Sequence, residues 1–164
     1  MLTSEKWGGA VAERCNEAMR LSRAFGENSD CITNYTNEDR KEMGDIFAVA
    51  SGVVLLCRLM AVDRGYHPAT IRMYDGLFSV FSRYAFKCML LCGAYESMDE
   101  IQVWCNKLTT GIGQRFQHYH VDPFRVFDAA ITLKKQNRKM LRARKVSIYL
   151  RDFLDLFREQ GVTE

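Results

Sequence analysis

Apolar residues recur every three or four positions along almost the whole chain, which is the spacing of one face of an α-helix. The first stripe consists of Trp7, Val11, Cys15, Ala18, Leu21 and Phe25. Only two of the 164 residues are proline, the residue that most strongly interrupts helices. No strand-like alternation of useful length competes with this pattern. The sequence therefore predicts an all-α fold, a single-domain bundle of five to seven helices.

The composition fits one globular domain that spans residues 1–164. Apolar residues make up 48% of the chain and charged residues 26%, a balance that is not that of a disordered protein. A chain of this length can bury a sizeable core. We expect the core to form around residues 46–62, because this segment is apolar on nearly every side and such a helix belongs in the middle of a bundle.

Capping signals mark the boundaries of the expected helices. A long polar loop, residues 26–37, follows the first stripe, and Thr36 or Asn37 can cap the second helix. Ser97 and Glu100 have the spacing of a capping box at the start of the fourth helix. Two glycines, Gly111 and Gly113, weaken that helix and favour a break or kink there.

The last region, residues 123–160, is expected to be helical and basic, starting with Asp122 as a cap and Pro123 at the first helical position. It carries two apolar stripes that are rotated relative to each other on a helical wheel. The first consists of Phe124, Phe127, Ile131 and Leu133, and the second of Val146, Tyr149, Leu150, Phe153, Leu154 and Phe157. Either the chain bends between the stripes or one helix packs against two surfaces.

Basic residues are concentrated between the two stripes. Seven of the twelve residues from 134 to 145 are Lys or Arg and none is acidic, so the other 152 residues carry 3 − 7 = −4 charges. Six cations share one arc of a helical wheel and predict an exposed ridge: Lys134, Lys135, Arg138, Lys139, Arg142 and Lys145. Guanidinium groups at Arg138 and Arg142 suit bidentate phosphate contacts, and Tyr149 is placed to stack on an exposed base.

Other candidate sites are weaker. His118 and His120 flank Tyr119, but with Asp122 they match no standard metal-ligand spacing. Cys88 and Cys92 lie one helical turn apart, and core packing explains them better than a bound ion. Cys31, in the polar loop, is the best candidate for a reactive thiol. We therefore expect no enzymatic activity, no metal and no cofactor.

The start of the chain lacks a signal-peptide pattern, and residues 46–62 contain Ser51 and Arg58, so we expect no membrane span. Most of the six cysteines fall on apolar helical faces, as reduced thiols of a cytosolic protein do. The expected location is intracellular, in the cytoplasm, with the nucleus left open.

These features predict a binding protein whose partner is an anionic polymer, RNA before DNA, held along residues 134–145 by salt-sensitive phosphate contacts. By analogy of architecture, such a subunit could form a homo-oligomer on RNA, as a coat or nucleocapsid protein does. The alternative is a protein–protein adaptor or regulator with a groove for a partner helix. In that case the ridge is a solvated face that confers solubility or attracts acidic partners.

Overall fold

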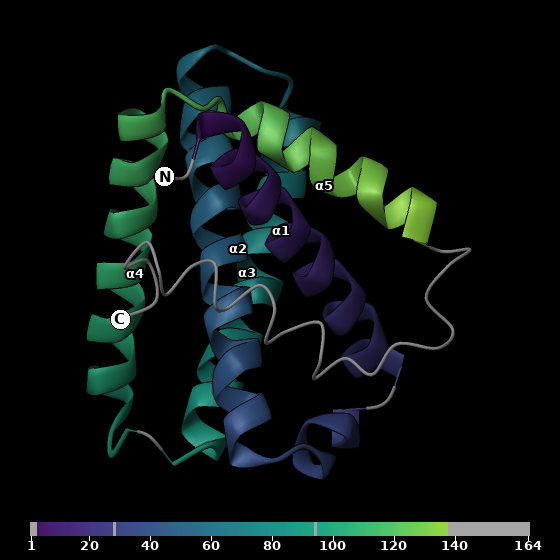
Figure 1. Cartoon of the computed structure of the whole chain (residues 1–164), viewed down its shortest axis with the longest axis vertical. Helices are drawn as coiled ribbons and strands as arrows, with labels where there is room; N and C mark the ends of the chain where they lie inside the picture. Colours follow the sequence, from purple (N-terminus) through teal and green to yellow (C-terminus); the bar gives the residue numbers. More distant parts are fainter. Residues whose placement is uncertain (1–2, 28, 94, 138–164) are drawn as a thin grey trace.

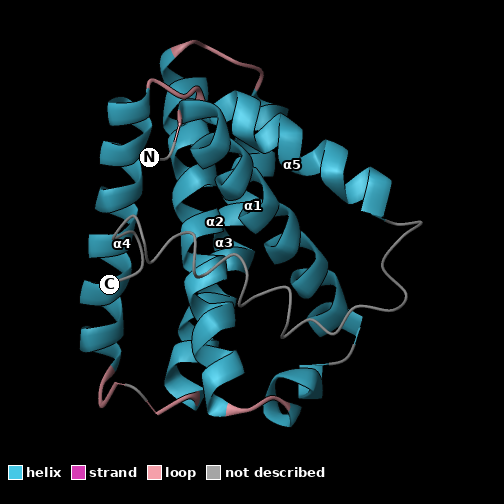
Figure 2. Ribbon diagram, viewed as in Figure 1, coloured by secondary structure: helices cyan, strands magenta, loops and turns pink. Residues whose placement is uncertain are grey.

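The computed structural model describes residues 3–27, 29–93 and 95–137, apart from the side chains of residues 29–31 and 134–137. This part of the chain contains five α-helices, one short 3-10 helix and no strand (Figure 2). The elements are α1 (Ser4–Glu27), η1 (Ser29–Asn34), α2 (Asn37–Asp63), α3 (Pro68–Leu91), α4 (Met98–Tyr119) and α5 (Pro123–Asn137). The predicted all-α bundle of five to seven helices is confirmed.

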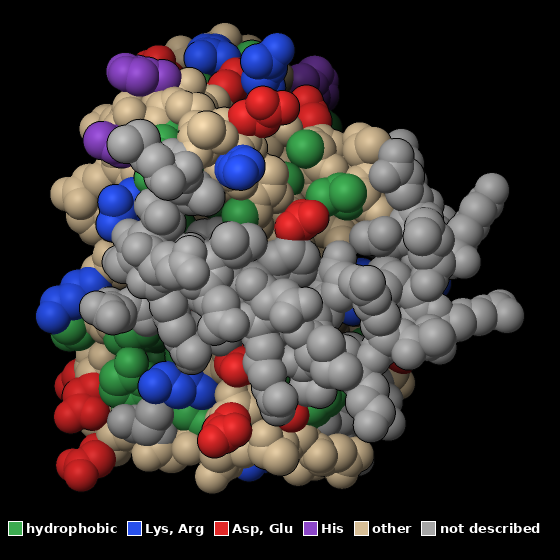
Figure 3. All heavy atoms as spheres, in the orientation of Figure 1, with side chains coloured by type: hydrophobic (Ala, Val, Ile, Leu, Met, Phe, Trp, Pro, Cys, Tyr) green, Lys and Arg blue, Asp and Glu red, His purple; other side chains and the backbone are tan. Residues whose placement is uncertain are grey.

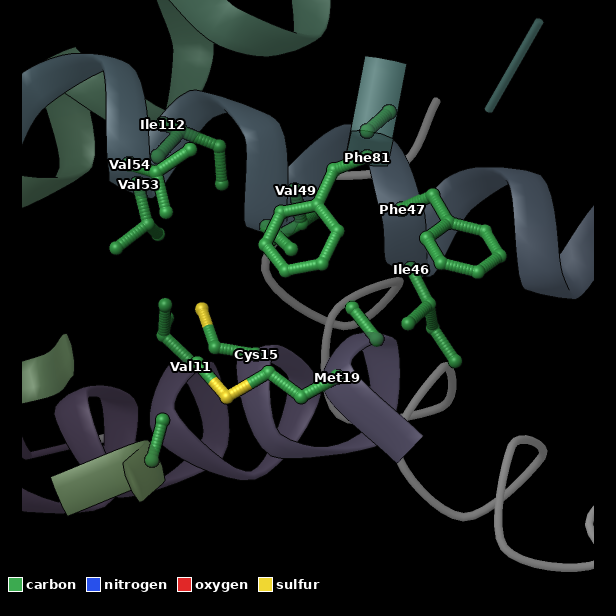
Figure 4. Packing of buried hydrophobic residues seen from close by; sticks show 14 of the residues in the cluster. Val11, Cys15, Met19, Ile46, Phe47, Val49, Val53, Val54, Phe81 and Ile112 are labelled. Atoms are coloured by element: carbon green, nitrogen blue, oxygen red, sulfur yellow. The ribbon is translucent and has the colours of Figure 1, made fainter. Parts of the chain in front are cut away.

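Helix α2 is the centre of the bundle, as its apolar sequence predicts. It contacts α1, α3, α4 and α5, and Figure 1 shows these helices arranged around it. Side chains from four helices meet in the core shown in Figure 4. They are Val11, Cys15 and Met19 of α1, Ile46, Phe47, Val49, Val53 and Val54 of α2, Phe81 of α3 and Ile112 of α4.

Within the described residues, α2 is also the one helix that is long and apolar enough to cross a membrane. Two-thirds of its most apolar window, 67%, is buried inside the bundle. A helix whose apolar surface is already covered by neighbouring helices has the character of a core helix.

The helix boundaries follow the capping residues. The hydroxyl of Thr36 accepts a hydrogen bond from the Asp39 amide at 3.1 Å, and Ser97 accepts one from the Glu100 amide at 3.3 Å. Asp122 accepts the amide of Phe124 at 2.9 Å, with Pro123 opening α5. Each side chain satisfies an amide that has no partner within its own helix.

Two features differ from the sequence-based expectations. Within the expected loop 26–37, the chain forms η1, and the buried side chain of Ile32 attaches this turn to the core. The expected break at Gly111 and Gly113 is wrong, because α4 runs as one helix from Met98 to Tyr119. Ile112 and Phe116 are buried on either side of Gly113, so tertiary packing outweighs the low helix propensity of glycine.

Helix α4 contacts the bundle mainly through α2, and it runs in the same direction as α2 (Figure 1). The two helices approach closely at Gly52, where a Cβ atom would lie 3.7 Å from the Thr109 Cα atom. Nearer its carboxyl end, α4 packs against α1, and the rings of Phe116 and Trp7 meet edge to face at 4.8 Å. Contacts between α4 and α3 are sparse by comparison.

Candidate functional site

The predicted RNA-binding ridge falls outside the part of the chain that can be described in detail. Lys134 and Lys135 lie in the last turn of α5, but their side chains are not described. Five further residues lie outside the described ranges altogether: Arg138, Lys139, Arg142, Lys145 and Tyr149. On the described surface in Figure 3, positive and negative side chains are interspersed. The ridge therefore stays a prediction from sequence.

The histidine pair forms no metal centre within the described residues, where no group of three or more His, Cys, Asp or Glu side chains could hold an ion. His118 is exposed in the last turn of α4, and its ring packs edge-on against Tyr119 at 4.9 Å. His120 ends α4 with φ 52° and ψ 42°, the left-handed conformation. It is the one non-glycine residue in the described ranges with a positive φ.

Five cysteines are buried free thiols: Cys15, Cys57, Cys88, Cys92 and Cys105. Burial raises the pKa of Cys57 and of Cys88 to about 12. Thiols of this kind are inert, since the thiolate is the reactive form. The prediction of reduced, buried cysteines is confirmed for these five residues, whereas the side chain of Cys31 is not described.

Within the described residues, a concave surface lies along α4 and begins with a lower hollow between α3 and α4. Leu55 of α2, Phe78 and Phe86 of α3 and Cys105 of α4 contribute apolar atoms to it. Its volume is about 370 Å³. The hollow remains open because α4 leans on α2 rather than on α3.

An upper hollow of about 700 Å³ adjoins the lower one. Thr110 lines both, so the two hollows follow each other along α4. Leu56 and Met60 of α2 line the upper hollow together with Pro123, the first residue of α5. We call the two hollows together the α4 groove.

The wall that α4 contributes to the groove is polar but uncharged. Gln102, Asn106, Thr110 and Gln114 recur every fourth residue and line one or both hollows, because residues four apart share a helical face. The Gln102 side chain donates a hydrogen bond to Asn106 at 3.0 Å. None of the described residues that line the groove is Lys, Arg, Asp or Glu.

Exposed apolar surface extends beyond the groove residues on α2. Leu59 is 52% exposed and Val62 is 50% exposed. Both share a face with Leu55, at the spacing i, i+4 and i+7. A helical stripe that leaves the core and continues half-exposed is typical of a surface that a further element covers.

The sequence analysis did not predict the position of the groove, although one sequence pattern on α4 is related to it. The four-residue repeat of uncharged polar residues along α4 is visible in the sequence, but it does not reveal which way α4 leans. The chain matches no protein-family model, no curated protein and no solved structure.

Proposed function

We propose that the protein is a non-enzymatic helical adaptor that receives an amphipathic helix of a protein partner in the α4 groove. The observation that carries the proposal is a pair of adjoining, largely apolar hollows with an uncharged wall. From Gln102 to His120, the residue that caps α4, the groove follows 18 residue steps, about 27 Å at 1.5 Å per residue. This length suits a partner helix of four to five turns.

The chemistry of the groove favours a helix over the other ligand classes. Helices bound in grooves insert apolar residues at spacings of three, four and seven, and two consecutive hollows offer places for such residues. Phosphate and carboxylate ligands are bound most strongly by charged donors such as Lys and Arg, and the described lining contains neither of these residues. Amide and hydroxyl side chains along one wall can hydrogen-bond to the polar edge of a bound helix.

The test uses the full-length protein and a displayed library of 18-residue amphipathic helical peptides. Selected peptides should carry apolar residues at helical spacing and bind the parent protein, as measured by fluorescence polarisation. Thr110→Trp places a bulky ring where the two hollows join, so we expect it to weaken binding by tenfold or more.

Thr132→Trp is the matched control. Thr110 and Thr132 are both exposed helical residues whose hydroxyls donate to the carbonyl four residues earlier, at 2.9 and 3.0 Å. Only Thr110 lines the groove. Equal binding by the two variants, or selection of peptides without an apolar stripe, would rule out the adaptor proposal.

A second candidate function, binding of RNA along residues 134–145, is favoured by the local charge of the sequence. Seven cations in twelve residues would release counterions on binding phosphates, so affinity would fall steeply as salt rises. Arg138 and Arg142 would make the tightest contacts, with Lys134, Lys135, Lys139 and Lys145 adding charge and Tyr149 stacking on a base. A coat-like subunit would also self-associate on the RNA.

The RNA proposal is tested with a single-stranded RNA oligonucleotide at low salt. Arg138→Glu with Arg142→Glu should abolish retention, whereas Arg23→Glu with Lys41→Glu should retain it. Each pair changes the net charge from +3 to 3 − 4 = −1, so overall charge is controlled, and both control residues are exposed in α1 and α2. Equal retention of both variants would refute binding along the basic run.

A further inference from the structure

The α4 groove ends where α5 begins, which places the chain's own carboxyl-terminal segment within reach of it. Pro123 lines the upper hollow and is also the first residue of α5. The 15 residues of α5 carry the chain away from this point by about 22 Å, at 1.5 Å per residue. Beyond Asn137, another 27 residues follow in the sequence.

The sequence of that segment contains an apolar stripe of the kind that the groove would accommodate. Residues 146–157 carry the second apolar stripe, formed by Val146, Tyr149, Leu150, Phe153, Leu154 and Phe157. As a helix, these twelve residues would extend about 18 Å, within the roughly 27 Å length of the groove. These residues lie outside the described ranges, so their apolar sequence pattern alone makes them candidates to occupy the groove.

We propose that residues 146–157 occupy the α4 groove of their own chain and compete there with a partner helix. The proposal rests on the proposed adaptor function and names the groove's internal ligand. From Asn137 to Val146, nine peptide steps span up to about 30 Å, more than the 22 Å needed to return along α5. The basic run, residues 134–145, connects α5 to residues 146–157. Docking of residues 146–157 in the groove would therefore hold the predicted phosphate-binding segment at both of its ends.

The test places a photo-reactive benzoylphenylalanine at single positions of the full-length chain. Asn106 lines the lower hollow and Gln117 the upper one, whereas their neighbours Lys107 and His118 line neither. All four residues are exposed on α4, so each probe has a control one residue away. After irradiation of a dilute sample, mass spectrometry of the digest identifies the crosslinked residues.

Crosslinks from positions 106 and 117 to residues 146–157 are expected, with at least a fivefold lower yield from positions 107 and 118. Leu150→Asp with Phe153→Asp should abolish them, because it removes the apolar stripe. Mixing ¹⁵N-labelled with unlabelled protein separates crosslinks within one chain from those between chains. Absence of these crosslinks, their survival in the Asp variant, or crosslinks between chains only would overturn the proposal.

The same Asp variant separates this inference from the adaptor proposal. A tethered segment acts at about millimolar effective concentration, so one that binds at about 100 µM should weaken a competing peptide about tenfold. The Asp variant should therefore bind a selected helical peptide about tenfold more tightly than the parent protein. If the Asp variant binds the peptide with the same affinity as the parent protein, while Thr110→Trp binds it much more weakly, the internal ligand is refuted and the adaptor function is left intact.

Discussion

Three helical glycines provide a direct test of how closely the helices approach one another. A glycine in a helix interior costs about 0.5–1 kcal/mol relative to alanine, so the surroundings of the added Cβ decide the outcome of each Gly→Ala change. Around Gly76 of α3, nothing lies within 4 Å of that position. At Gly52, the nearest atoms belong to Ile112 and Thr109 at 3.7 Å, an ordinary contact. Both substitutions should raise the free energy of unfolding by roughly 0.5–1 kcal/mol.

Gly44 of α2 should behave in the opposite way. A Cβ atom there would lie 3.0 Å from the Met89 Cε atom and 3.1 Å from its Cγ atom, and Met89 is completely buried. Forcing a methyl group into a packed core costs about 1–3 kcal/mol. After subtraction of the helix-propensity gain, Gly44→Ala should lower the free energy of unfolding by up to about 2 kcal/mol.

Urea denaturation of the parent protein and the three variants, followed by circular dichroism, measures these differences. A shift in midpoint at constant slope reports stability alone, and 1 kcal/mol corresponds to about 2–4 °C in melting temperature at this chain length. If Gly44→Ala is as stable as Gly76→Ala, Met89 repacks at no cost and the close approach of α2 and α3 does not constrain the core. Destabilisation by Gly52→Ala would instead contradict the spacing of α2 and α4.

Three further substitutions or treatments have defined outcomes. Burial raises the pKa of the Glu17 carboxyl group, even though the Arg20 side chain donates a hydrogen bond to it at 2.7 Å. The folded state therefore favours the protonated carboxyl group, and the stability that this provides is lost as pH rises through the raised pKa. Glu17→Gln removes this titrating group and should therefore flatten the pH dependence of the free energy of unfolding above the ordinary pKa of a carboxyl group; an unchanged pH dependence would contradict this. His120→Gly should stabilise by about 1 kcal/mol by relieving the left-handed conformation, as seen in melting temperature, and His120→Val should not. Burial raises the pKa of Cys57 and Cys88 to about 12, and Cys15, Cys92 and Cys105 are buried as well. These five thiols should resist Ellman's reagent until urea unfolds the chain. Rapid reaction of any of the five would contradict their burial.

The sequence predicts helices and their starts well, because those signals are local. Thr36, Ser97 and Asp122 each cap the helix that follows them, since a cap requires only a side-chain oxygen and an amide two or three residues away. The all-round apolar character of residues 46–62 likewise identified the central helix, because only the core covers every side of a helix.

The groove could not be predicted, because it depends on tertiary packing. Its opening follows from the packing of α4 on α2 rather than on α3, for example where Gly52 lies beside Thr109, residues that are more than 50 positions apart in the sequence. The continuity of α4 through Gly111 and Gly113 was misjudged for a related reason, as neighbouring buried residues override local propensity. The RNA-binding prediction remains untested, because most of the basic run lies outside the described residues.

The one-sided attachment of α4 has a consequence for local opening. Its buried residues form a single row, Ile101, Cys105, Leu108, Ile112 and Phe116, whereas sixteen residues of α2 are buried. Segments with few buried contacts open at a lower free energy than the core. Amide hydrogens of α4 should therefore exchange with deuterium before those of α2. If α4 moves away from the core as a whole during such opening, the groove beside it can widen to accept bound helices of different diameter.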